Sequence, residues 1–83
     1  MVRRIRGRFA DAGALESAKF IWCLHCECAY PGEWFRSKGW SACPGDRCDG
    51  SILDWQTWED SQARRAHPEY PGVPVSGGFY PMF

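Results

Sequence analysis

Long hydrophobic runs are missing from this sequence of 83 residues. No stretch reaches the about 18 consecutive apolar residues that a membrane-spanning helix needs. The first residues, Met-Val-Arg-Arg-Ile-Arg, carry charge but are not followed by an apolar core, so a secretory signal peptide is not expected. From these absences we expect a cytoplasmic protein that makes no contact with membranes.

Recognisable catalytic motifs are also absent. The chain has two histidines, and it shows no Ser-His-Asp pattern, no glycine-rich phosphate loop followed by Lys-Ser or Lys-Thr, and no evident pair of carboxylates. We therefore expect a protein that is not an enzyme and that has no small-molecule substrate.

The formal net charge is zero, because ten basic residues balance ten acidic ones. Such a chain lacks the uniform positive field that draws proteins to nucleic acids, although a local patch can still supply one. Four positive charges fall within the first eight residues and form a basic arm. The arm could bind phosphate or an acidic protein surface, and the alternative is a solvated tail or an edge strand. Its arginines are Arg3, Arg4, Arg6 and Arg8.

Aliphatic residues are scarce, so the aromatic residues, which make up 16% of the chain, must supply much of the core. A chain this short makes one domain with a small core, and a metal ion often stabilises such folds. The five cysteines can provide a metal site. Their odd number and the lack of a signal peptide favour metal ligands over a framework of disulfides.

Four of the cysteines form two short hooks. Two residues separate Cys23 from Cys26, four separate Cys43 from Cys48, and sixteen lie between the hooks. Each hook can deliver two thiolates to one ion, and a tetrahedron of four thiolates is a typical structural site for Zn²⁺. The predicted metal ligands are therefore Cys23, Cys26, Cys43 and Cys48. Because such a site keeps no open position, the metal is expected to stabilise the fold rather than to catalyse a reaction.

Two further residues near the first hook could bind the ion but are less well placed. Cys28 lies two residues after Cys26, and along an extended segment that spacing points side chains to opposite sides. We expect Cys28 to be a small buried side chain. His25 is expected to point outward, since four thiolates already close the site. Arg47 and backbone N–H groups would offset the negative charge of the thiolates.

The segment 20–50 is predicted to form a small antiparallel sheet around the hooks. Phe20–Cys23 is an apolar run that leads into the first hook, as a strand would. Ala29–Gly32 ends in a Pro-Gly pair and predicts a turn. Glu33–Arg36 is expected to return as a strand, and Trp40–Cys43 is expected to be a third strand that leads into the second hook.

The rest of the chain supplies a helix and an extended tail. Ser51 and Asp54 have the spacing of a capping box, and neither glycine nor proline occurs in the twelve residues that follow, which predicts a helix. The tail contains many prolines and aromatic residues. We expect it to be a strap docked on the domain, and the alternative is a proline-rich docking peptide. The predicted fold is a single small α+β metal-bound domain with a basic arm (1–19), a zinc ribbon (20–50), a helix (51–67) and an extended strap (68–83).

The ribbon resembles known families. The pattern Trp22-Cys23-x2-Cys26, Ala29-Tyr30, Cys43-Pro44 and Cys48-Asp49-Gly50 is similar to the rubredoxin-like and zinc-ribbon families over about a third of the chain. The later pattern, with Trp55, Trp58, His67-Pro68-Glu69-Tyr70-Pro71 and Gly78-Phe79-Tyr80-Pro81, is similar to small uncharacterised bacterial zinc-ribbon proteins.

The resemblance to rubredoxins implies an alternative metal and function. Rubredoxins bind one iron and carry single electrons, and a glycine follows each of their hooks so that backbone N–H groups can approach the sulfurs. Here Glu27 and Asp49 stand at those positions, and the second hook is two residues longer. These departures favour Zn²⁺ over iron.

These observations lead to a hypothesis about function. We expect a non-enzymatic zinc-ribbon module that binds a macromolecule, either RNA or DNA or a protein associated with nucleic acid. The choice of partner follows from analogy with other small ribbons. The alternatives are a rubredoxin-like iron protein that carries electrons and a subunit that acts only inside a larger complex.

Overall fold

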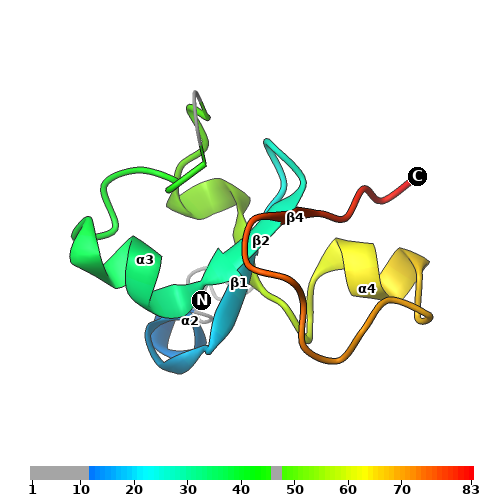
Figure 1. Cartoon of the computed structure of the whole chain (residues 1–83). Coiled ribbons are helices and arrows are strands. Elements are labelled where there is room, and N and C mark those ends of the chain that lie inside the picture. Colours follow the sequence, from blue (N-terminus) through cyan, green and yellow to red (C-terminus); the bar gives the residue numbers. More distant parts are fainter. Residues whose placement is uncertain (1–11, 46–47) are drawn as a thin grey trace, which may run out of the picture.

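The computed structural model describes residues 12–45 and 48–83. Four strands form an antiparallel sheet in the order β3-β1-β2-β4 (Figure 1). The expectation of a small antiparallel sheet is confirmed, although three of its four strands are not those predicted. The strands are β1 (Phe20–Cys23), β2 (Cys28–Pro31), β3 (Trp55–Thr57) and β4 (Gly78–Phe79).

Short helices connect and flank the strands. The segment before β1 contains a helix of six residues. Within the described residues, no helix is long and apolar enough to cross a bilayer. The helices are α2 (Ala12–Ser17), α3 (Gly32–Ser37), the 3₁₀ helix η1 (Ile52–Asp54) and α4 (Gln62–Ala66).

The hairpin of β1 and β2 lies at the centre of the sheet. The strand predicted at Phe20–Cys23 is confirmed as β1, and Cys23 pairs with Cys28 across the turn that contains the first hook. The turn predicted at Ala29–Gly32 is wrong. Ala29 and Tyr30 instead belong to β2, because they pair with the buried residues Trp22 and Ile21 of β1.

The strand predicted at Glu33–Arg36 is also wrong, since this segment belongs to α3. Phe35 is its fully buried side chain, and the guanidinium of Arg36 donates to the carbonyl oxygen of Glu16 at 2.7 Å. A Cβ at Gly32 would collide with the carbonyl oxygen of Ala18, so glycine allows α3 to pack close to the end of α2. The helix therefore forms through contacts with a neighbouring element.

No strand forms at Trp40–Cys43 either. The backbones of Gly39 and Trp40 are left-handed, with φ of 63° and 61°. Two consecutive left-handed residues reverse the chain, which an extended strand does not allow. The N–H of Trp40 donates to the carbonyl oxygen of Phe35 at 3.0 Å, so the reversal closes directly onto the end of α3.

The long helix predicted over 51–67 is reduced to the five residues of α4. The capping box of Ser51 and Asp54 does form, but it caps the 3₁₀ helix η1. Immediately afterwards, Trp55–Thr57 becomes β3 by pairing with β1. The open edge of β1 thus accepts a strand from a segment whose local sequence favours a helix. Ser61 then caps α4 by accepting a hydrogen bond from the N–H of Arg64.

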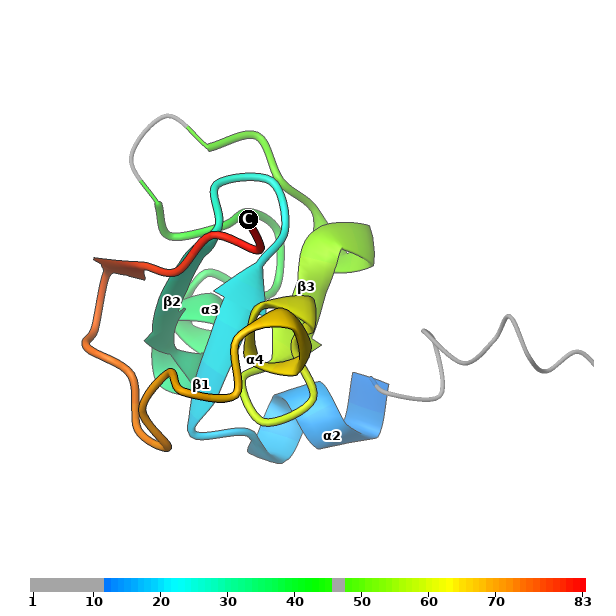
Figure 2. The same ribbon diagram turned by 90° about the vertical axis from the view of Figure 1, so that its right-hand side faces the viewer.

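The sheet separates two apolar clusters. Successive residues of a strand point to opposite faces, so Ile21 and Cys23 enter one cluster and Trp22 enters the other. Figure 1 shows α3 and α4 on opposite sides of the sheet, and Figure 2 shows α4 in front of β1. The first cluster consists of Leu15, Ile21, Cys23, Tyr30, Phe35, Cys43 and Trp55, and the second of Trp22, Ala29, Trp58 and Ala63.

The tail packs as a strap, but only part of it is docked. Tyr70, Tyr80 and Met82 pack against the second cluster, whereas Val75 is largely exposed and Phe83 is 95% exposed. The strap also adds β4 to the edge of β2.

Side chains of earlier residues hold the carbonyl groups at the end of the strap. The indole N–H of Trp22 donates to the carbonyl oxygen of Tyr80 at 3.0 Å, and the hydroxyl of Tyr70 donates to that of Pro81 at 2.8 Å. Nε2 of His67 donates to the carbonyl oxygen of Met82 at 2.9 Å. These bonds come from both the sheet and the region after α4, and they hold the end of the strap against the domain.

Candidate metal centre

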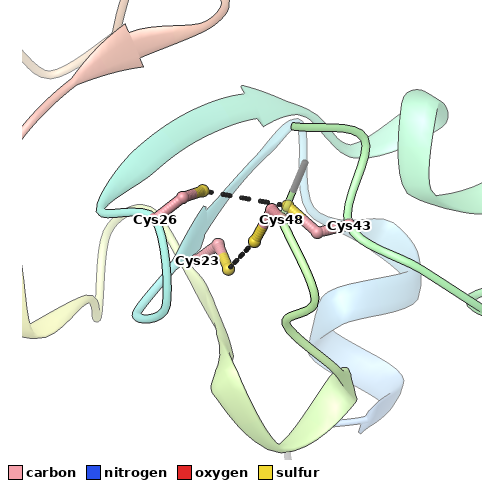
Figure 3. Close-up of side chains that lie close together, drawn as sticks. All are labelled: Cys23, Cys26, Cys43 and Cys48. Carbon is pink, nitrogen blue, oxygen red and sulfur yellow. Dashed lines mark hydrogen bonds between the residues drawn. The ribbon is translucent and has the colours of Figure 1, made fainter. Parts of the chain in front are cut away.

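Four cysteine sulfurs meet at one end of the sheet. All four Sγ atoms lie within 4.8 Å of one another, and Figure 3 shows their side chains converging. Sγ of Cys23 is 3.7 Å from that of Cys48, and Sγ of Cys26 is 3.9 Å from that of Cys43. A regular tetrahedron with metal–sulfur bonds of about 2.3 Å has edges of about 3.8 Å. The cluster therefore has the size needed to hold one metal ion, and its members are the four cysteines predicted from their spacing.

The first hook is a tight turn between β1 and β2. The N–H of Glu27 donates to the carbonyl oxygen of Cys23 at 2.7 Å, and the N–H of Leu24 donates to that of Asp54 at 2.8 Å. Glu27 has a left-handed backbone with φ of 58°. It stands where the rubredoxin-like pattern has a glycine, so the turn keeps a conformation that glycine adopts more easily.

Contacts with the strap account for a glutamate at this position. The carbonyl oxygen of Glu27 accepts a hydrogen bond from the N–H of Tyr80 at 2.7 Å. Its carboxylate accepts one from the N–H of Met82 at 3.1 Å. A glycine would relieve the backbone but could not make the second bond.

The second hook supplies backbone donors to the sulfurs. The N–H of Gly45 donates to Sγ of Cys43, and the N–H of Gly50 donates to Sγ of Cys48, each at 3.3 Å. A Cβ at Gly50 would lie 2.8 Å from Sγ of Cys23, which is too close for any other residue. Sequence reasoning missed both glycines. The available signal is that each lies two residues after a cysteine of the hook.

His25 contacts the cluster, which corrects the expectation that it turns away from the hook. Its side chain is exposed, but Nδ1 lies 3.5 Å from Sγ of Cys48. The turn of the first hook faces the end of the second hook at this point, and this brings the imidazole beside a sulfur. His25 is not one of the four clustered residues.

Cys28 is separate from the cluster. Its thiol donates to the carbonyl oxygen of Cys26 at 3.4 Å and packs against the first apolar cluster. The side chain is only half-buried, so the expectation of a fully buried residue is not met. Burial raises the pKa of the Cys28 thiol.

Tyr30 is a further neighbour that sequence reasoning did not assign to the site. Its hydroxyl lies 3.8 Å from Sγ of Cys26, and its ring is buried in the first apolar cluster. Burial raises the pKa of Tyr30, which keeps its hydroxyl protonated. A protonated hydroxyl at this position can donate to a thiolate.

The cysteines of the cluster shift one another's pKa values in opposite directions. The hydrogen bond from Cys43 lowers the pKa of Cys23 to about 5, with further help from the backbone N–H groups of Cys26 and His25. The same bond to Cys23, together with burial, raises the pKa of Cys43. Burial raises the pKa of Cys48 to about 11. A metal ion that binds all four sulfurs must therefore displace protons.

The donor set limits what the centre can do. Four sulfurs fill a tetrahedral coordination shell and leave no position for a substrate or a water molecule. Soft thiolate ligands suit both Zn²⁺ and iron. Within 12–45 and 48–83, this is the single group of three or more potential metal-binding side chains that was found. The proposed partner-binding residues Arg3, Arg4, Arg6 and Arg8, and also Arg47, lie outside the described residues.

Comparisons with protein-family models, with curated proteins and with solved structures find no match to the chain. The geometry of the centre is therefore the basis for the functional conclusion.

Proposed function

We propose that this chain is a zinc-ribbon module in which one Zn²⁺, bound by Cys23, Cys26, Cys43 and Cys48, stabilises a surface that binds a macromolecule. The observation that carries the metal proposal is the spacing of the four sulfurs. The distances of 3.7 Å between Cys23 and Cys48 and of 3.9 Å between Cys26 and Cys43 match the edge of a zinc–thiolate tetrahedron. The module is not an enzyme in this proposal, because four protein ligands leave zinc no open position.

The position of the ligands supports a structural role for the metal. Cys23 and Cys43 are buried and belong to the first apolar cluster, together with Phe35 and Trp55. The metal would thus join the two hooks at the edge of the small core that a chain of this length can form. The free energy of binding the ion would then contribute directly to the free energy of folding.

The proposed partner is a nucleic acid or a protein bound to one. The described residues carry five lysines and arginines against eight aspartates and glutamates. This part of the chain is therefore net negative and offers little attraction to phosphate. The basic arm, with Arg3, Arg4, Arg6 and Arg8, would supply the contacts to phosphate, and the ribbon would hold the arm in place.

Metal analysis with a matched pair of variants tests the zinc site. We expect the purified chain to hold one zinc per molecule. Cys43→Ser should lose the metal and most of its thermal stability, whereas Cys28→Ser should keep both, since Cys28 lies outside the cluster. Equal zinc content and equal melting temperatures in the two variants would refute the site.

A rubredoxin-like iron centre is the alternative, and one observation favours it. Gly45 and Gly50 donate N–H groups to two of the sulfurs. Backbone N–H···S bonds of the rubredoxin kind therefore form, although Glu27 and Asp49 replace the glycines of the rubredoxin pattern. Such bonds tune the potential of iron–thiolate centres. An iron protein would be red with visible charge-transfer bands, while the proposed zinc protein is colourless. Colour in the protein as purified from its native cells would favour electron transfer.

Binding assays with matched charge variants test the partner. Fluorescence anisotropy with labelled single-stranded RNA and duplex DNA should show binding that weakens with salt. Changing Arg3 and Arg4 to alanine should weaken it, whereas changing Lys38 and Arg65 removes the same charge from the described part and should have little effect. Equal losses in the two double variants, or no binding at any salt concentration, would contradict a role for the arm.

A further inference from the structure

Exposure differs among the four sulfurs of the cluster. Cys23 and Cys43 are buried, whereas Cys26 and Cys48 are partly exposed. Water, protons and oxidants reach exposed thiolates more readily than buried ones. The exposed pair is therefore the half of the site from which a bound metal would be lost first.

The buried and the exposed sulfurs also differ in the hydrogen-bond donors that face them. The buried sulfurs receive backbone N–H groups, from Gly45 at Cys43 and from the first hook at Cys23. Each exposed sulfur also faces a donor on a side chain. The donor is His25 at Cys48 and Tyr30 at Cys26.

His25 reaches Cys48 from the opposite hook. Nδ1 lies 3.5 Å from Sγ, and it donates in the tautomer that carries its proton on Nδ1. Cys48 already accepts the N–H of Gly50 at 3.3 Å. The imidazole therefore adds a second donor to this sulfur, and it links the two hooks without being a ligand.

Tyr30 reaches Cys26 from β2. Its hydroxyl lies 3.8 Å from Sγ, and the ring is fixed by Phe35 at a centroid distance of 6.2 Å. A Cβ at Gly45 would lie 2.5 Å from this hydroxyl, so the second hook passes directly over it. The hydroxyl is thus held between the two hooks, beside the one sulfur for which no backbone donor has been described.

We propose that His25 and Tyr30 are positioning residues that retain the metal by donating hydrogen bonds to the two exposed ligand thiolates, Cys48 and Cys26. The inference rests on the proposed metal site and adds the residues that hold the metal in it. Donors to a metal-bound thiolate lower its electron density and so slow its protonation and oxidation, and loss of such partners typically weakens metal binding by about 10-fold to 100-fold.

The test measures metal retention in the full chain. Zn²⁺ affinity is determined by competition with a chromophoric chelator for the parent, His25→Ala and Tyr30→Phe. Each variant should bind zinc at least about 10-fold more weakly than the parent. His25→Asn should restore much of the affinity, because the amide nitrogen of asparagine can replace Nδ1 as a donor. Tyr70→Phe is the matched control, since its hydroxyl donates to the carbonyl oxygen of Pro81.

A spectroscopic readout separates hydrogen bonding from a general loss of structure. With Co²⁺ in place of zinc, loss of a donor raises the energy of the sulfur electrons, so the sulfur-to-cobalt band of His25→Ala and Tyr30→Phe should move to longer wavelength. The bands of Tyr70→Phe should stay at the position of the parent. Unchanged bands and affinities in the first two variants would overturn the inference.

Failure of the inference and failure of the zinc site give different results. If the parent binds neither Zn²⁺ nor Co²⁺, the proposed metal function is wrong and the inference falls with it. If the parent binds both metals and the variants match it, the metal site stands and the positioning roles are wrong. Weaker binding with unshifted bands would also reject those roles, because it would indicate a structural effect.

Discussion

The N–H of Met82 donates to the carboxylate of Glu27 at 3.1 Å, across 55 positions of the sequence. Glu27 belongs to the first hook, directly after Cys26, so this bond ties the end of the strap to the metal centre. The same residue accepts the N–H of Tyr80 through its carbonyl oxygen. A residue with a left-handed backbone thus makes a side-chain bond that glycine could not make.

Replacing Glu27 by alanine should lower stability. The variant loses the bond to Met82 but keeps the left-handed backbone, so nothing offsets the loss. A hydrogen bond to a charged group contributes about 1.5–3 kcal/mol, and each kcal/mol shifts the melting temperature of a small domain by about 4–8 °C. Thermal unfolding of the zinc-loaded chain measures the effect. Glu27→Gln keeps an acceptor and should lose less than half as much, and an equal loss in both variants would contradict the role of the bond.

Gly50→Ala should weaken metal binding. The new Cβ would lie 2.8 Å from Sγ of Cys23, so the second hook must move away from the first. Overpacking of this kind typically costs about 1–3 kcal/mol, which corresponds to roughly a 5-fold to 150-fold loss of zinc affinity if the strain falls on the bound state.

Gly72→Ala is the control for this variant. Nothing lies within 4 Å of a Cβ at Gly72, so its zinc affinity should match that of the parent. Chelator competition on both variants gives the comparison. An affinity of Gly50→Ala equal to that of Gly72→Ala would show that the hooks tolerate the added methyl group.

Acid should weaken metal binding steeply between pH 8 and pH 6. The raised pKa values of Cys43 and Cys48, the latter about 11, leave both thiols protonated throughout this range when no metal is bound. Binding must release those protons, so lowering the pH favours the metal-free chain. The lowered pKa of Cys23, about 5, means that this residue adds to the effect only in more acidic solution.

Calorimetry in buffers of different ionisation enthalpy counts the released protons. Release of two protons would lower the affinity by about 100-fold for each pH unit. An affinity that stays constant from pH 8 to pH 6 would show that the thiols are already ionised before the metal binds.

Ser61→Ala should destabilise the chain by about 1–2 kcal/mol. Ser61 is 0% exposed, its hydroxyl donates to the carbonyl oxygen of Trp58 at 2.8 Å, and it accepts the N–H of Arg64. Removing the hydroxyl takes the cap from the N–H of Arg64 and leaves the carbonyl oxygen of Trp58 with the backbone N–H of Ser61 alone. Ser51→Ala removes the exposed cap of η1 and should cost less in the same unfolding experiment. A larger loss of stability in Ser51→Ala than in Ser61→Ala would contradict this prediction.

The sequence was sufficient to predict the metal cluster but not its surroundings. The spacing of Cys23, Cys26, Cys43 and Cys48 reports directly on ligand geometry, because two short hooks have few ways to meet. The contacts of His25 and Tyr30 depend on how the hooks face each other. That arrangement is set by the sheet and has no local signal in the sequence.

The errors in secondary structure also have physical causes. In α3 a single buried side chain, Phe35, gives no visible helical period, and the Pro-Gly pair at its start favours a turn. Trp55–Thr57 lacks glycine and proline and resembles part of a helix, yet it forms β3 because β1 has an unpaired edge. Contacts between residues far apart in sequence override weak local preference in both cases, through packing in α3 and through strand pairing in β3.

The bonds at the end of the strap have a consequence for how the chain is made. One of these bonds joins the indole of Trp22 to the carbonyl oxygen of Tyr80, which is synthesised 58 residues later. Closing a long loop costs more entropy than closing the short β1–β2 hairpin, so the strap should dock last. Until the strap has been synthesised and has docked, the second apolar cluster stays open on that side, and the nascent protein presents Trp22 and Trp58 to its surroundings.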